Sequence, residues 1–302
     1  MNITDWHARS TEGFADLVAR IRDDQWSLPT PCTDWDVRAL VNHVVGEDLW
    51  TVPLMHEHRI ADVGDKFDGD VLGGDPKETA ARAAGQAVAA VSEPGALDRT
   101  AHLSFGNFPA TEYAYQLLAD HLIHGWDLAV AIGADTHLDP HLVHECGTWF
   151  ADREELYRQG GVIGPAVPVA ASAGEQARLL AGSGRDPQWS PAVGAVQRYL
   201  TAIDSRDIEA TMAAVTEDVV WENTTPPDGV RYAGAAAVRA ATEEFLRDNP
   251  KAIFEVEELA ALGADRAAAR WRYSWEDGHV RGVDLFRIRA GQVAEVLSYA
   301  KG

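Results

Sequence analysis

The segment DHLIHGWDL, residues 120–128, lies in the middle of an apolar stretch between Pro109 and Gly133. Proline suits the start of a helix and glycine its end, so this stretch is predicted to form one long helix. Asp-Pro pairs at residues 75–76 and 139–140 mark two further helix starts, each followed by apolar residues at helical spacing. Four or five such helices joined by loops predict an up-and-down bundle.

An earlier helix is predicted to begin at TDWD, residues 33–36, where an acidic residue stands three positions after a threonine cap. Apolar residues then recur at helical spacing up to Val45, and His43 lies among them. Cys32 lies directly before this helix. Because the sequence fixes no histidine partner for its thiol, we interpret it as a packing cysteine.

The composition excludes several classes of protein. The chain has 302 residues, with 47 acidic and 26 basic side chains and a formal net charge of −21. Nucleic acids and anionic membranes are bound through clustered Lys and Arg, so neither is expected as a partner. No segment approaches the roughly 18 apolar residues of a membrane span, and the first residues lack the pattern of a signal peptide. The two cysteines are too few for a disulfide framework, and we expect a cytoplasmic protein.

A segment rich in glycine, serine and proline, AGSGRDPQWSP at residues 181–191, predicts a linker between two domains, 1–187 and 191–302. Beyond it, three helices are predicted at residues 193–203, 208–215 and 235–246, and four strands at 253–259, 267–275, 279–288 and 293–299. Turn signals at 276–278 and 289–291 separate the last strands. The predicted fold class is therefore multidomain: an all-α bundle followed by an α+β cone with a curved antiparallel sheet.

Asp120 and His124 are candidates for a metal site. Four residues apart on a helix, they share one face with two leucines and are expected to point into the bundle. A buried carboxylate beside an imidazole is costly, and a divalent ion such as zinc satisfies both. His43 is the best candidate for a third ligand, although by helical spacing alone a histidine on an apolar face is usually one satisfied within the core. His121 points about 100° away, and we expect it at the surface or behind the ligands.

Two motifs resemble the mycothiol-dependent maleylpyruvate isomerases and their actinobacterial relatives. They are WSLPTPCTDWDVRALVNHVVGE, residues 26–47, and HGWDLA, residues 124–129. The resemblance covers about residues 1–187 and implies a DinB-like four-helix bundle that holds a divalent metal, usually zinc, through two histidines and one carboxylate. Carried onto this chain, the metal ligands are His43, Asp120 and His124, where the characterised isomerases have Glu in place of the Asp. Those isomerases also have a different C-terminal domain, so maleylpyruvate itself is not expected as the substrate.

Residues 191–302 resemble the SnoaL-like, nuclear-transport-factor-like α+β cone, most clearly in HVRGVDLFRIRAGQVAEVLSY, residues 279–299. That fold hosts isomerases, cyclases, hydrolases and binding modules, so it does not fix a function. Asp284 alternates with apolar residues on one strand face and is a candidate catalytic acid or base in a cavity. The alternative is an ion pair with a cross-strand arginine, Arg270 or Arg272. Four aromatic side chains are candidates for either a pocket wall or the core: Trp221, Trp271, Tyr273 and Trp275.

The resemblances lead to a first hypothesis, a metal-dependent thiol S-transferase or isomerase in which a metal-bound thiolate attacks a small electrophile. Mycothiol is the co-substrate that the resemblance implies. The alternatives are an acid–base isomerase, cyclase or hydrolase that uses the C-terminal cavity with a regulatory bundle, and a non-catalytic ligand-binding protein. The expected partners are a small-molecule electrophile, a low-molecular-weight thiol and, by resemblance, a second copy of the chain bound cone to cone.

Overall fold

A computed structural model describes residues 2–33, 35–224, 229–276 and 278–301 of the chain. The chain divides into two compact units, Met1–Pro187 and Gln188–Gly302. Within the described residues, no helix is both long and apolar enough to cross a membrane.

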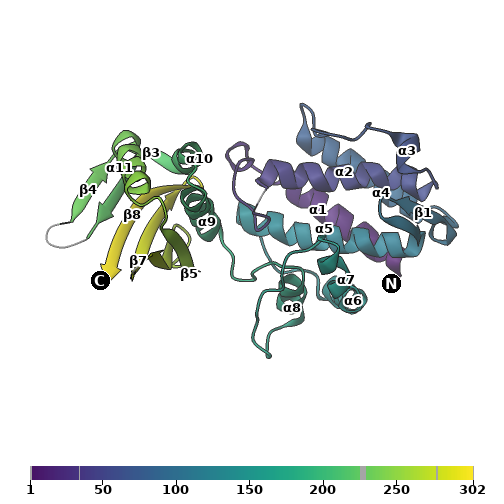
Figure 1. Ribbon diagram of the computed structural model, residues 1–302. Coiled ribbons are helices and arrows are strands. Elements are labelled where there is room, and N and C mark those ends of the chain that lie inside the picture. The colour runs from purple at the N-terminus through teal and green to yellow at the C-terminus, as the bar shows by residue number, and fades with distance from the viewer. Residues whose placement is uncertain (1, 34, 225–228, 277, 302) are drawn as a thin grey trace. The chain divides into compact units, whose positions relative to one another are not determined.

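Four long helices form the bundle of the first unit (Figure 1). They are α1 (Ile3–Ala19), α2 (Val37–Met55), α4 (Pro76–Ser92) and α5 (Ala110–Ile132). Helix α5 packs against α1 and α2, and α4 packs against the same two helices from the other side. Shorter elements surround the bundle: α3 (Ile60–Val63), α6 (Pro140–Ala151), α7 (Glu154–Gln159), α8 (Glu175–Gly182) and a hairpin of β1 (Thr100–Leu103) and β2 (Gly106–Pro109).

Three of the predicted helix boundaries in this unit are confirmed. The carboxylates of Asp75 and Asp139 accept backbone N–H groups at the starts of α4 and α6, and Gly133 ends α5 in the left-handed conformation. The cap predicted at Thr33 was wrong. A turn closed by the Trp35 N–H and the Cys32 carbonyl precedes the helix, so α2 begins later, and Asp36 caps it by accepting the Ala39 N–H. Asp34, which belonged to the predicted start, lies outside the described residues.

The second unit is an α+β domain in which helices cover a six-stranded sheet. Its helices are α9 (Pro191–Asp204), α10 (Ile208–Ala213) and α11 (Ala235–Asp248). Its strands are β3 (Val215–Asn223), β4 (Val230–Ala233), β5 (Ile253–Ala261), β6 (Arg266–Trp275), β7 (Gly278–Arg289) and β8 (Gln292–Lys301). The sheet order is β4-β3-β8-β7-β6-β5, antiparallel throughout except for the parallel pair β3 and β8.

The four strands predicted after residue 252 are all present, as are the three helices. Strands β3 and β4 were missed, and the predicted helix 208–215 ran into the first residue of β3. At the predicted turn 289–291, Ala290 and Gly291 take positive φ angles of 50° and 74°, as a tight hairpin requires. Asp277, within the other predicted turn, lies outside the described residues. The apolar core lies between α9 and one face of the sheet.

Candidate metal centre

Three side chains from two neighbouring helices converge in the first unit. His43 comes from α2, and Asp120 and His124 come from the facing side of α5. The Asp120 Oδ1 atom lies 3.4 Å from His43 Nε2 and 3.5 Å from His124 Nε2. One donor atom of each residue lies within 4.8 Å of the other two. The structure therefore brings together the three residues that the sequence analysis selected.

The donor set fits a divalent ion in chemistry and spacing. Two imidazole nitrogens and a carboxylate oxygen are ordinary zinc ligands, with bonds of about 2.0–2.2 Å, and in a tetrahedral site such ligands lie about 3.4 Å apart. The second carboxylate oxygen, Asp120 Oδ2, is buried and has no hydrogen-bond partner among the described residues. Burial opposes ionisation of Asp120, but His124 and His43 beside it hold the pKa of that carboxyl well below its ordinary value.

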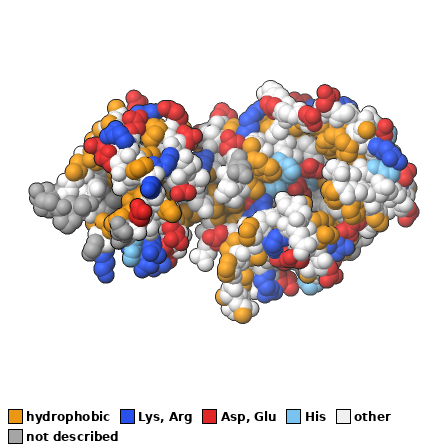
Figure 2. All heavy atoms as spheres, in the orientation of Figure 1, with side chains coloured by type: hydrophobic (Ala, Val, Ile, Leu, Met, Phe, Trp, Pro, Cys, Tyr) orange, Lys and Arg blue, Asp and Glu red, His pale blue; other side chains and the backbone are white. Residues whose placement is uncertain are grey.

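The three side chains lie at one end of a cavity of about 500 Å³. Its walls come from one face of α2, one face of α5, the β1–β2 hairpin and the segment between α6 and α8. Most of the lining is apolar, and six of its members are aromatic: Trp50, Phe105, Tyr113, Trp149, Phe150 and Tyr157. Figure 2 shows histidine and acidic side chains among apolar ones in a hollow of this unit's surface. The donor atoms are therefore accessible to a small molecule.

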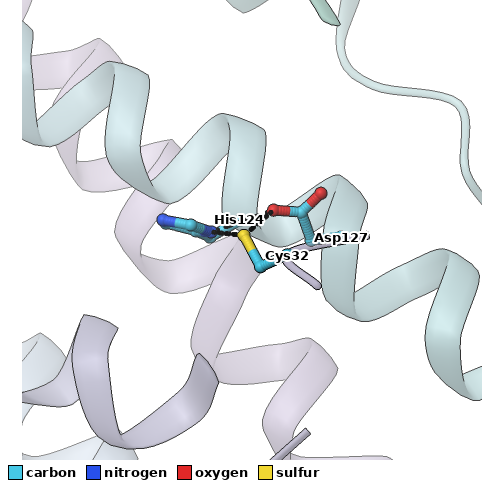
Figure 3. A group of neighbouring side chains, drawn as sticks. All are labelled: Cys32, His124 and Asp127. Carbon is cyan, nitrogen blue, oxygen red and sulfur yellow. Dashed lines mark hydrogen bonds and ion pairs between the residues drawn. The ribbon is translucent and has the colours of Figure 1, made fainter. Parts of the chain in front are cut away.

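A second group of polar side chains lies behind His124, on the opposite edge of its ring (Figure 3). The Asp127 Oδ2 atom accepts from His124 Nδ1 at 2.9 Å, and the Cys32 thiol donates to the same oxygen at 3.4 Å. Asp127 is fully buried. Since Nδ1 carries the hydrogen of that bond, Nε2 of His124 is left with a free lone pair toward the cavity.

Arg185 supplies the positive charge of this second group. Its Nη2 atom lies 3.0 Å from Asp127 Oδ2 and 2.8 Å from the Cys32 sulfur. A guanidinium already supplies the positive charge that a metal ion would bring, so Cys32, Asp127 and His124 do not form a second ion site. Burial and the Asp127 charge raise the pKa of the Cys32 thiol far above its ordinary value, which keeps it a hydrogen-bond donor. The group is a hydrogen-bonded support for the His124 ring.

Asp127 and Arg185 were not predicted as functional residues, and Cys32 was predicted only to pack. Asp127 carried a usable signal, because it stands three residues after His124 and therefore beside it on the same helix. Arg185 and Cys32 are separated from Asp127 by 58 and 95 residues and reach it from loops, so no local pattern places them there.

His121 does not lie at the surface, and that part of its prediction was wrong. Its ring is fully buried; Nε2 lies 3.0 Å from Asp48 Oδ1, and Nδ1 lies 2.7 Å from the Leu117 carbonyl oxygen. Helix α1 covers this face of α5, and Phe14 and His7 place their rings against the imidazole. Although burial lowers the pKa of His121, the Asp48 carboxylate raises it to about 9.

Asp284 lies in a separate cavity of about 290 Å³ within the second unit. The carboxylate accepts a hydrogen bond of 2.8 Å from Trp271 Nε1. Arg270 and Arg272 lie on the other sheet face, where Arg270 pairs with Glu257 and Glu258, so neither of them forms the predicted ion pair with Asp284. Burial raises the pKa of Asp284 to about 6.

Three of the four aromatic candidates, Trp221, Trp271 and Tyr273, line this second cavity. Trp275 does not line the cavity; it lies at the end of β6 and is 49% exposed. The cavity is thus lined mainly by aromatic and aliphatic side chains, and Asp284 carries the one carboxyl group among its described lining residues.

Comparison with known proteins gives matches to both halves of the chain. Residues 7–129 match the model of the mycothiol maleylpyruvate isomerase N-terminal domain, and residues 196–296 match that of the SnoaL-like domain. An uncharacterized protein of Mycobacterium tuberculosis, present in strains CDC 1551 and H37Rv, is 36% identical over 148 residues. The match covers 46% of this chain and 72% of that protein.

Solved structures similar to the chain include two NTF2-like proteins of unknown function. The one from Mesorhizobium loti is 36% identical, covers 37% of this chain and 92% of its own, and has a TM-score of 0.34. The one from Burkholderia xenovorans is 19% identical, covers 37% of this chain and 83% of its own, and has a TM-score of 0.33.

Proposed function

Because this chain belongs to the family of the mycothiol maleylpyruvate isomerase N-terminal domain and carries a SnoaL-like domain after it, we propose that it is a metal-dependent thiol S-transferase or isomerase. Its first unit would act on a small electrophile with the thiol of mycothiol. The observation that carries the proposal is the convergence of His43, Asp120 and His124 at the end of an open cavity.

These three residues would hold the ion, which we propose to be zinc. Held by three protein ligands, such an ion would keep one coordination position free and would supply the positive charge that favours loss of the proton of a thiol near neutral pH. Asp127 fixes the orientation of the His124 ring, and Arg185 neutralises the charge of Asp127. The three ligands would thus leave one coordination position of the ion facing the cavity.

The remaining cavity wall would bind the electrophile. Its aromatic and aliphatic side chains exclude water and hold an acceptor of modest size next to the sulfur. Attack of the sulfur on the β-carbon of an activated alkene such as an enone forms an S–C bond, while the carbon–carbon π bond breaks and its electrons pass to the acceptor as an enolate. Retention of this bond gives S-transfer, and its elimination after rotation about the adjacent carbon–carbon bond gives cis–trans isomerisation.

Removal of the ion is expected to abolish thiol-dependent turnover. The full chain is loaded with zinc, and conversion of the enone trans-4-phenyl-3-buten-2-one is followed with mycothiol before and after treatment with a strong chelator. We expect at least a 100-fold loss of rate, with recovery when zinc is restored, because the thiolate fraction falls without the ion. Turnover that survives complete removal of the ion would contradict the proposed function.

A second candidate function rests on the other cavity. A carboxyl group whose pKa is about 6, enclosed by aromatic side chains, is suited to act as an acid or a base near neutral pH. The SnoaL-like unit would then perform acid–base chemistry through Asp284, independently of the bundle.

The Asp284→Asn variant is expected to be more stable than the wild type at pH 7. Burial raises the pKa of Asp284 from 3.8 to about 6, so the folded state binds its proton more tightly than the unfolded state. Wild-type stability therefore falls as the pH rises from about 4 to 6, and the penalty of about 2–3 kcal/mol is complete above pH 6. The asparagine avoids this penalty and keeps an oxygen for Trp271. Urea unfolding of the full-length wild type and Asp284→Asn at pH 4 and pH 7 measures the difference in their free energies of unfolding. The same difference at both pH values would contradict a buried titrating carboxyl.

A further inference from the structure

Glu47 lies in the same cavity as the three candidate ligands. It stands four residues after His43, so the two side chains occupy neighbouring turns of one face of α2. Trp50 and Leu54 continue this face along the cavity wall. The opposite wall, from α5, contributes the side chains Tyr113, Gln116, Leu117, Asp120, Ile123 and His124.

The carboxylate of Glu47 has no ion pair or hydrogen bond with any side chain that the structure describes. This distinguishes it from the other charged groups of the centre. Asp127 is paired with Arg185, and Asp48 is paired with His121. A half-buried carboxylate without a protein partner is free to bond with a molecule that enters the cavity.

Glu47 does not belong to the group of candidate ligands. The donor atoms of His43, Asp120 and His124 lie within 4.8 Å of one another, and the group does not extend to Glu47. Its carboxylate lines the wall of the same cavity one helical turn from His43, where it can exchange a proton with a molecule that enters the cavity.

The surroundings of Glu47 favour its protonated form more than water does. Burial raises the pKa of Glu47, and the charge of Asp120 raises it further, while His43 and His121 act in the opposite direction. Asp48, from the same helix, adds a smaller effect that raises it.

We propose that Glu47 is the catalytic base that accepts the proton of the incoming thiol. The inference rests on the proposed function. The S–H bond breaks, the proton moves to a carboxylate oxygen of Glu47, and the sulfur keeps the electron pair. When that pair forms the S–C bond with an enone, the displaced π electrons pass to the acceptor as an enolate, and the proton on Glu47 is returned to it.

The test counts protons and does not depend on turnover. Mycothiol, and in parallel the uncharged thiol N-acetylcysteamine, is titrated into the zinc-loaded full chain by calorimetry at pH 7 in two buffers of different ionisation enthalpy. In the wild type Glu47 retains the thiol proton. In the Glu47→Gln variant, which has nearly the same shape, we expect about one more proton per chain to be released to the buffer. The Glu47→Asp variant should behave like the wild type.

Three controls make each outcome decisive. Glu12→Gln removes the same charge from an exposed position on α1 and should leave the proton count unchanged. Metal analysis of Glu47→Gln should still give one zinc per chain, and loss of the metal would overturn the proposal by making Glu47 a ligand. Equal proton release in the wild type and Glu47→Gln would overturn it as well. A zinc-loaded wild type that binds neither thiol would refute the proposed function, and this role of Glu47 with it.

Discussion

The His124→Ala variant is expected to lose its bound metal, from about one ion per chain to nearly none, together with all thiol-dependent turnover. Helix α5 supplies two of the three donor atoms, and without the imidazole the remaining pair, Asp120 and His43, cannot hold a zinc ion against a competing chelator. Native mass spectrometry and elemental analysis of the purified full chain measure the change.

The matched control for this variant is His137→Ala. The side chain of His137 is 91% exposed and lies beyond the end of α5, so its loss should leave the metal content at about one ion per chain. His43→Ala should behave like His124→Ala, and circular dichroism should show that the second unit stays folded in each variant. Full metal occupancy in both His43→Ala and His124→Ala would refute the metal centre.

The sequence was most informative where a single local pattern decides the geometry. Asp120 and His124 are four residues apart on one helix, and Asp284 alternates with apolar neighbours along one strand, so the faces they share follow from the helical and strand periods alone. The helix ends at Asp75, Asp139 and Gly133 could be predicted equally well, because each cap depends only on residues within one turn of it.

The wrong and missing predictions concern features that depend on contacts with distant parts of the chain. Helix α5 has neighbours on several sides, so it has no clear solvent face, and spacing could not show that His121 is buried beneath α1. Strand β3 was missed because its acidic residues interrupt the alternation and because its parallel partner β8 lies far away in the sequence. Arg185 reaches the centre from the loop after α8, at a distance in sequence that no periodicity spans.

The support behind His124 leads to a second large expected effect, in the Asp127→Asn variant. An amide is a weaker acceptor than a carboxylate for the His124 Nδ1–H group, and it can turn its NH2 group toward the ring, so the imidazole is held less firmly for the metal. We expect zinc affinity, measured by competition with a chromophoric chelator, to fall by about 10- to 100-fold.

The same substitution leaves the Arg185 guanidinium buried without its counter-charge, and we therefore also expect the free energy of unfolding to fall by about 3–5 kcal/mol. A double variant, Asp127→Asn with Arg185→Met, separates the two effects. Removal of the unpaired cation should restore much of the stability, as urea unfolding would show, while zinc affinity should stay low because His124 still lacks its carboxylate. If zinc affinity recovered together with stability, the loss in the single variant would be a consequence of unfolding, and Asp127 would have no role in positioning the His124 ring.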